Sequence, residues 1–221
     1  MKPFHPQPEA LPDEIAIFPL SGALLLPWGR LPLNIFEPRY LAMTEDALAN
    51  GRMLGMIQGD PARGKRPDGG SQVFSVGCLG RLSSFAETED GRLLVTLTGV
   101  ARFRVVEEIE TRRGYRRIRA DYAPFLADLE PETLPVPRND IMTALRPYFA
   151  GRGMEVNWEA IEALSDAALV TTLCMVCPFS VAEKQALLEA DTLPERAGTL
   201  ATLLRMAVHD GGDLPPTGLP S

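Results

Sequence analysis

The first stretch whose residue types and spacing could do chemistry is residues 59–66, which read GDPARGKR. A G-x-x-x-x-G-K sequence that follows a strand begins a P-loop, whose backbone N–H groups hold the phosphates of a nucleotide. Here Arg66 replaces the hydroxyl residue that a P-loop needs for magnesium, and the following PDGGS cannot begin the required helix. We therefore interpret residues 59–66 as a connection between strands.

A second stretch, CMVCP, places Cys174 and Cys177 at the spacing of thiol redox sites and of half a zinc site. Zinc would need two more ligands, and the only histidines, His5 and His209, are far away in the sequence. A redox pair needs an exposed thiol at a helix N-terminus, whereas both cysteines end the apolar run AALVTTLCMVC. We predict that both thiols are buried and pack as small apolar groups.

A third stretch, residues 102–119, contains seven arginines and is the candidate for binding nucleic acid. On extended strands, Arg102 and Arg104 share one face, and Arg117 and Arg119 share one face of the next strand. We expect these arginines to face water, where the interleaved glutamates favour cross-strand ion pairs over binding of RNA. RNA binding by these four arginines stays open as the alternative hypothesis.

Residues for nucleophilic catalysis are not assembled in any recognisable pattern. The sequence has neither G-x-S-x-G nor H-E-x-x-H. A Ser-Lys dyad needs no histidine, but Lys2 and Lys65 lie in a predicted tail and loop, and Lys184 lies on a predicted exposed helix face. We therefore expect no enzymatic activity, no catalytic residue, no cofactor and no metal.

An acid, a base and a phenol stand together in Glu37, Arg39 and Tyr40, where an apolar extended run meets a predicted helix. Pro38 suits the first helical turn, and the charge of Glu37 favours the positive end of the helix dipole. Tyr40 is spaced to face the core, and Arg39 can reach Glu37. We interpret this cluster as a strand-to-helix junction and not as an active site.

The residues before about 124 show the pattern of a β-rich lobe. Short β-branched and aromatic runs alternate with turn residues, and one helical pattern covers residues 38–49. Because closure removes free strand edges, we expect a closed or nearly closed antiparallel barrel. The strands that the pattern predicts are residues 15–19, 24–26, 53–58, 76–85, 92–98, 101–108 and 115–122.

The residues after about 137 show helical periodicity, and four or five helices are expected to form a compact bundle. SVAE is a capping box, in which Ser180 and Glu183 each accept the backbone N–H of the other. The N-caps predicted for further helices are Asn157, Ser165 and Thr192.

Composition is that of an ordinary globular protein, with 221 residues, 45% of them hydrophobic and 23% charged. The net charge of -7 disfavours binding to nucleic acid or anionic membranes. No apolar run approaches the roughly 18 residues of a membrane span, and the start lacks the pattern of a signal peptide. Three cysteines fit free thiols in a reducing compartment. We therefore expect a cytoplasmic protein that does not bind membranes.

The expected domain division follows a change in composition at LADLEPETLPVP. It gives a flexible tail over residues 1–13, a β-rich lobe over residues 14–126, an α-helical lobe over residues 127–209 and a flexible tail over residues 210–221.

Five stretches, in this order, resemble the N-terminal, substrate-binding domain of Lon-type ATP-dependent proteases. They are IAIFPLSGALLLPWGRLPLNIFEPRY (15–40), GRMLGMIQ (51–58), VGCLGRL (76–82), DGRLLVTLTGVARFRV (90–105) and PFSVAEKQALLEA (178–190). The resemblance spans nearly the whole folded chain. It implies an α+β fold, in which a PUA-like β pseudobarrel is followed by a C-terminal helical bundle.

In Lon proteases this domain is linked to the recognition of unfolded or tagged substrates and to assembly of the oligomer. The resemblance therefore implies a non-catalytic module that binds unfolded or extended protein segments at apolar grooves of the barrel and lobe junction. Such a module could act as an adaptor in proteolysis or protein quality control, with a protease or chaperone as partner. PUA-like folds also occur in RNA-binding proteins, which keeps the RNA alternative open by analogy.

Lon proteases continue into an ATPase module with a complete P-loop and a protease domain with a Ser-Lys dyad. The sequence resembles a free-standing form of the N-terminal domain without these two parts. A peptidase label would therefore describe the family and not an activity of these residues. The sequence does not define the oligomeric state or the identity of the partner.

Overall fold

The computed structural model describes residues 6–66 and 69–209, which fall into two compact units. The first unit ends at Glu132 but also includes residues 171–189, and the second unit contains the remaining helical residues. The expected division into consecutive β-rich and α-helical lobes differs from these units, because residues 171–189 pack with the strands. The predicted C-terminal tail and the first five residues of the N-terminal tail lie outside the described residues.

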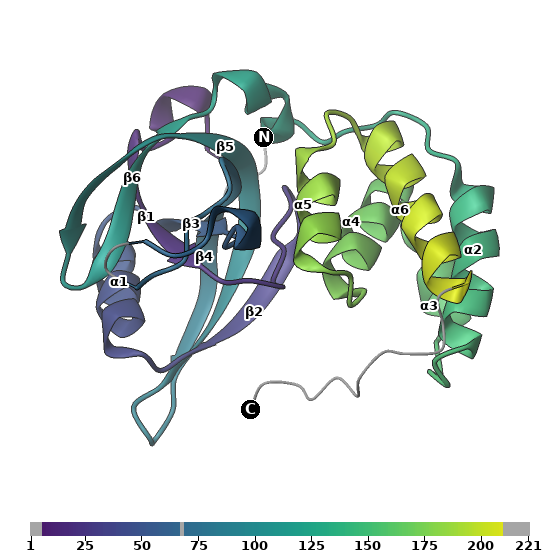
Figure 1. Cartoon of the computed structure of the whole chain (residues 1–221), viewed down its shortest axis with the longest axis horizontal. Helices are drawn as coiled ribbons and strands as arrows, with labels where there is room; N and C mark the ends of the chain where they lie inside the picture. The colour runs from purple at the N-terminus through teal and green to yellow at the C-terminus, as the bar shows by residue number, and fades with distance from the viewer. Residues whose placement is uncertain (1–5, 67–68, 210–221) are drawn as a thin grey trace. The chain divides into compact units, whose positions relative to one another are not determined.

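Six strands form one sheet in the first unit (Figure 1). They are β1 (Glu14–Pro19), β2 (Arg30–Ile35), β3 (Met53–Ile57), β4 (Val76–Glu87), β5 (Leu93–Arg112) and β6 (Tyr115–Asp121). The strand order is β2-β5-β4-β3-β1-β6, and the additional pairing of β5 with β6 closes five strands into a ring. Strand β2 pairs only with β5 and so lies outside this ring.

The strand predictions were largely confirmed, with three corrections and one omission, because β2 was not among the predicted strands. Strands β1 and β3 pair in parallel, so the sheet is mixed and not antiparallel throughout. The predicted strands 92–98 and 101–108 are one long strand, β5. Residues 24–26 are buried but are not a strand, since they take part in no strand pairing with the described residues, although their backbone lies close to β5: a Cβ on Gly99 would be 2.0 Å from the carbonyl oxygen of Leu26.

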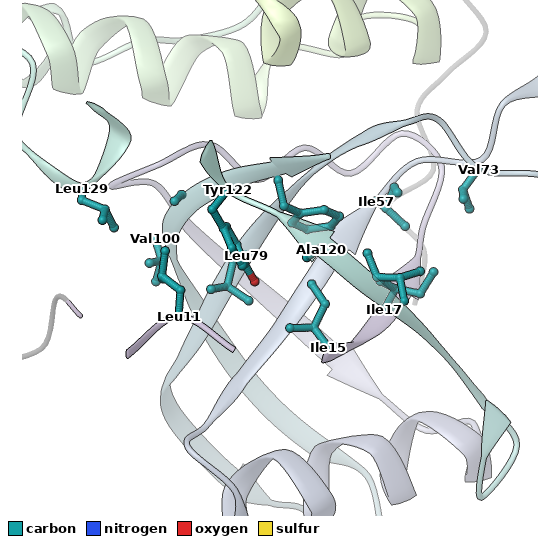
Figure 2. Packing of buried hydrophobic residues seen from close by; sticks show 13 residues of the cluster. Leu11, Ile15, Ile17, Ile57, Val73, Leu79, Val100, Ala120, Tyr122 and Leu129 are labelled. Carbon is teal, nitrogen blue, oxygen red and sulfur yellow. The ribbon is translucent and has the colours of Figure 1, made fainter. Parts of the chain in front are cut away.

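A cluster of apolar side chains from the strands and their connections forms a core in the first unit (Figure 2). Phe103 of β5 is fully buried in this cluster. Glycines on the neighbouring strands make room for its ring, since a Cβ on Gly77 would lie 2.4 Å from it and one on Gly55 would lie 2.9 Å from it. Interiors are packed at crystal density, so no larger residue fits at these two positions without displacing the ring.

The helices of the first unit cover the sheet and its connections. Helix α1 (Pro38–Ala49) begins and ends as the sequence predicts and buries Tyr40, Met43 and Ala47 on one face. Helix α5 (Val181–Glu189) contacts β4, and the capping box predicted at its start is present. The short 3-10 helices are η1 (Pro8–Ala10), η2 (Pro61–Arg63) and η3 (Ala123–Leu129).

The second unit is built from helices, in agreement with the periodicity of the sequence. They are α2 (Arg138–Ala150), α3 (Trp158–Glu162) and α6 (Leu193–His209), together with the first residues of α4 (Asp166–Val176), which ends in the first unit. The side chains of Asn157, Ser165 and Thr192 accept the backbone N–H of the third residue of α3, α4 and α6, respectively, so these predicted N-caps are confirmed.

Candidate functional site

The P-loop-like stretch connects two strands, as predicted. Gly59 forms a β-bridge with Val73, and the carboxylate of Asp60 accepts the N–H of Ala62 at 2.9 Å. Only the three-residue helix η2 lies within it, and the described residues 69–75 contain no helix. No helix N-terminus in this part of the structure could hold a phosphate.

The Cys-x-x-Cys pair is buried, as predicted. Cys174 is fully buried, Cys177 is 2% exposed, and neither forms a disulfide. Within the described residues, no three His, Cys, Asp or Glu side chains gather so that they could hold a metal ion. These observations favour packing over redox or metal chemistry.

Arg102 was predicted to face water, and this prediction is wrong. Its side chain is 5% exposed, and its Nε and Nη2 donate to the carboxylate of Asp128, both at 2.9 Å. Nη1 donates to the carbonyl of Leu188 in α5, and the guanidinium lies 4.8 Å from the ring centre of Phe125. The alternation rule failed here because both faces of β5 are covered, one by the barrel core and the other by η3 and α5.

The other three arginines of the RNA hypothesis are at least partly exposed, but two of them are already paired with carboxylates. Arg117 binds Glu14 at 2.7 Å, and Arg119 binds Glu107 and Glu14. Arg104 is exposed. The cross-strand ion pairs that the sequence favoured are therefore present on β6, and the four arginines do not form one basic surface.

Lys184 was predicted to lie on an exposed helix face, and this prediction is also wrong. It is 6% exposed, and its Nζ donates to the carbonyl of Gly22 at 2.6 Å. Burial lowers the pKa of this ammonium. The neighbouring Gln185 is also buried and donates to the carbonyl of Val76, while its amide oxygen accepts from Gln58. Two adjacent buried polar residues mark the face on which α5 lies against the first unit.

The cluster of Glu37, Arg39 and Tyr40 is a strand-to-helix junction, as predicted. Arg39 donates to the carboxylate of Glu37 at 2.8 and 3.0 Å, on the protein surface. Tyr40 is buried against Phe18, with ring centres 4.1 Å apart, and burial raises the pKa of its phenol. A protonated phenol and a paired acid and base leave no group available for catalysis.

A cavity of about 220 Å³ lies between α1, β1 and the start of β6. Its polar groups bind one another: the Tyr115 hydroxyl donates to Asp46 at 2.7 Å, and Arg117 pairs with Glu14. Burial, followed by the contact with Asp46, raises the pKa of Tyr115 to about 12, and the hydrogen bond from Tyr115 lowers the pKa of Asp46. These acidic, basic and phenolic groups of the cavity wall are therefore bound to one another, which does not favour a role as a catalytic acid or base.

One part of the first unit is a small three-stranded sheet that extends from the ring. It consists of β2, residues 93–98 of β5 and residues 82–87 of β4, and we call it the distal sheet. Figure 1 shows the β4–β5 hairpin reaching beyond the other strands. Three large apolar side chains on or beside this sheet are about half exposed, namely Phe36 at 57%, Phe85 at 51% and Leu94 at 48%.

These apolar residues lie on both faces of the distal sheet. Leu94 is on the outer face, and Phe36 extends the outer-facing side of β2, where Arg92 lies 5.7 Å from its ring centre. Phe85 pairs with the buried Val95 and so lies on the core side, at the rim. Exposed aromatic and aliphatic groups, here on both faces of one small sheet, are typical of surfaces that bind proteins.

No helix in the part of the chain that the structure describes is both long and apolar enough to cross a membrane.

Comparisons with known proteins identify the relatives of this sequence. A sequence profile of the ATP-dependent protease La (LON) substrate-binding domain matches residues 14–206. The Lon protease of Dictyoglomus thermophilum is 24% identical over 196 residues, which are 86% of this chain and 24% of that protease. Lon protease 2 of Myxococcus xanthus is 26% identical over 113 residues, which are 51% of this chain and 13% of that protease. The chain thus spans a quarter or less of the length of these relatives.

Two solved structures share the fold. A Lon N-terminal domain protein from Xanthomonas campestris superimposes with a TM-score of 0.59 at 21% identity, covering 86% of this chain and 97% of that chain. The N-terminal domain of the Mycobacterium avium complex Lon protease superimposes with a TM-score of 0.59 at 15% identity, covering 89% of this chain and 98% of that chain.

Proposed function

Because the chain belongs to the family of Lon substrate-binding domains, we propose that it is a protein-binding module that recognises unfolded or extended segments of other proteins. The proposal includes a role as an adaptor, which presents such segments to a protease or chaperone. Binding, and not catalysis, is the activity that we assign to the described residues.

The observation that carries this proposal is the group of half-exposed apolar side chains on the distal sheet. Folded proteins expose their apolar segments little, whereas unfolded chains expose many of them. A surface that offers Phe36, Phe85 and Leu94 gains free energy by burying such segments. Aromatic side chains are also enriched among the residues that dominate binding energy at protein interfaces.

The RNA alternative has less support. Of its four arginines, Arg102 is buried, and Arg117 and Arg119 are occupied by carboxylates. An RNA phosphate would have to displace these carboxylates, and the net charge of -7 opposes its approach.

Fluorescence anisotropy with a labelled, permanently unfolded protein such as reduced and alkylated casein tests the proposal. A triple variant with Phe36, Phe85 and Leu94 replaced by serine should bind roughly tenfold or more weakly than the unchanged chain. The matched control replaces Val106 and Leu126 by serine as well; these two side chains are 59% and 45% exposed elsewhere in the first unit.

The control variant should keep its affinity if the distal sheet is the binding surface. Equal loss in both variants would show that binding is non-specific. No binding by the unchanged chain, or tighter binding to a single-stranded RNA of similar length, would overturn the proposed function.

A further inference from the structure

The distal sheet has two free strand edges. Within residues 6–66 and 69–209, strand β2 pairs only with β5, so its other edge has no partner strand there. Strand β4 pairs with β3 only up to Arg81, so residues 83–87 have β5 on one side and, among the described residues, no strand on the other. A bulge between Leu82 and Ser84 marks the point where β4 leaves β3. Unpaired edges are templates for the addition of another strand.

Hydrogen-bond alternation shows which backbone groups of β4 face its free edge. The N–H of Thr88 donates to the carbonyl of Arg92 at 3.0 Å, and the register of β4 with β5 is unbroken from Ser84 to Glu87. Since bonded and non-bonded pairs alternate in an antiparallel ladder, Ser84 and Ala86 bind β5. The N–H and C=O groups of Phe85 and Glu87 therefore point away from β5, toward the open edge.

The edge of β2 is less suited to strand addition. The N–H of Gly99 donates to the carbonyl of Gly29, and the same alternation makes Arg30, Pro32 and Asn34 face outward. Proline has no N–H, so the middle position of this edge cannot donate a hydrogen bond. Proline on an edge strand is one of the devices by which proteins prevent pairing.

The side chains around the β4 edge indicate the chemistry of its partner. Every residue from Ser83 to Glu87 is exposed, and Phe85 provides an apolar contact beside the edge. At the hairpin tip, Asp90 pairs with Arg92 at 2.8 Å, whereas Glu87 and Glu89 have no ion-pair partner among the described residues. The edge is thus apolar at Phe85 and acidic toward the tip, which complements an extended segment with apolar residues and a nearby basic residue.

We propose that residues 83–87 of β4 bind an extended segment of an unfolded protein as an added β-strand, with apolar residues of that segment at Phe85 and a lysine or arginine at Glu87 and Glu89. This inference rests on the proposed function and assigns it a binding mode. Backbone hydrogen bonds to Phe85 and Glu87 supply affinity for any sequence, and the side-chain contacts supply selectivity. A site of this kind selects unfolded partners, because an unfolded chain has backbone N–H and C=O groups that are not already hydrogen-bonded within the partner.

A labelled ten-residue peptide with alternating valine and threonine and one lysine near its end is the probe. Glu87→Pro removes one outward N–H without a loss to the β5 ladder and should weaken binding roughly tenfold. Asn34→Pro is the matched control, since it removes an outward N–H from the opposite edge, and it should leave affinity unchanged. Glu87→Gln distinguishes the contribution of the side-chain charge from that of the backbone hydrogen bond. It should weaken binding of the lysine peptide but not of a peptide with glutamine in place of lysine.

Amide hydrogen exchange in the unchanged chain gives a test that needs no variant. The peptide should protect the N–H groups of Phe85 and Glu87 and leave those of Arg30 and Asn34 unchanged. If the peptide binds but protects neither Phe85 nor Glu87, strand addition at β4 is wrong while the proposed function stands. If the peptide does not bind while the unfolded casein does, strand addition is wrong and the proposed function stands; if neither binds, both are wrong. A dimer that Glu87→Pro abolishes would show instead that a second copy of the chain occupies this edge.

Discussion

Replacing Asp128 by alanine should destabilise the first unit far more than breaking any surface ion pair, because it leaves a buried guanidinium without its carboxylate. One carboxylate oxygen of Asp128 accepts the backbone N–H and the Nε of Arg102, both at 2.9 Å, and the other accepts Nη2 at 2.9 Å. The side chains of Arg102 and Asp128 are only 5% and 10% exposed. Three charge-assisted or buried hydrogen bonds are therefore lost at once, and water cannot replace them fully.

The expected loss is about 3–5 kcal/mol of unfolding free energy, which is the range for removing one partner of a buried ion pair. The double variant Arg102→Met/Asp128→Ala should recover a large part of this loss, because it also removes the stranded charge. The control is Glu107→Ala, which breaks a pair with Arg119 whose side chains are about half exposed, and it should cost about 0–1 kcal/mol.

Urea unfolding followed by tryptophan fluorescence measures these differences. The chain has two tryptophans, Trp28 in the first unit and Trp158 in the second, so a Trp158→Phe background makes the signal specific for the first unit. The Trp28 indole donates to the backbone carbonyl of Asp128 at 2.9 Å, a bond that the alanine substitution retains. A loss below about 1 kcal/mol for Asp128→Ala, or a double variant less stable than the single one, would refute the reasoning.

Three further outcomes follow from individual contacts. Gly99→Ala should cost about 3 kcal/mol or more in thermal unfolding, because its Cβ would lie 2.0 Å from a backbone carbonyl oxygen, whereas Gly198→Ala, with open space around the new Cβ, should be neutral or stabilising. Lys184→Met should destabilise the chain less at neutral pH than near pH 10.5. The folded pKa of Lys184 is lowered, so the unchanged chain gains stability as the pH rises from this folded pKa toward the unfolded value. Urea titrations of both chains at several pH values check this. Tyr115→Phe should raise the pKa of Asp46 toward its usual value, measured by NMR titration, and an unchanged pKa would show that the phenol is not what stabilises the carboxylate.

The local elements were predictable wherever a short sequence signal determines them. The helix that begins at Pro38 and the capping box of Ser180 and Glu183 are set by neighbouring residues, and the structure confirms both. The turn of Arg113 and Gly114 between β5 and β6 also needs only local chemistry, since both residues have positive φ.

The burial of charged residues was not predictable, because it depends on segments distant in the sequence. Arg102 alternates with apolar neighbours as an exposed strand residue does, but η3 and α5 cover it. Lys184 follows the pattern of a surface helix, yet its partner Gly22 is 162 residues away. Both predictions failed at places where a second layer of structure covers a face that the local pattern assigns to solvent.

The distal sheet was missed for a related reason. The sequence predicted strands over residues 76–85 and 92–98, which contain Phe85 and Leu94, but gave no sign that residues 83–87 would extend beyond their neighbour β3. A free edge is a property of strand pairing and not of any one strand, so it becomes visible only in the sheet topology.

Hydrogen exchange with mass spectrometry on the complex with a permanently unfolded protein tests the central claim most directly. The proposed function predicts protection of segments that contain residues 82–98, with little change in the arginine-rich residues 104–119. Protection confined to residues 104–119 or to the helices of the second unit, or no protection anywhere, would contradict the assignment of the distal sheet as the protein-binding surface.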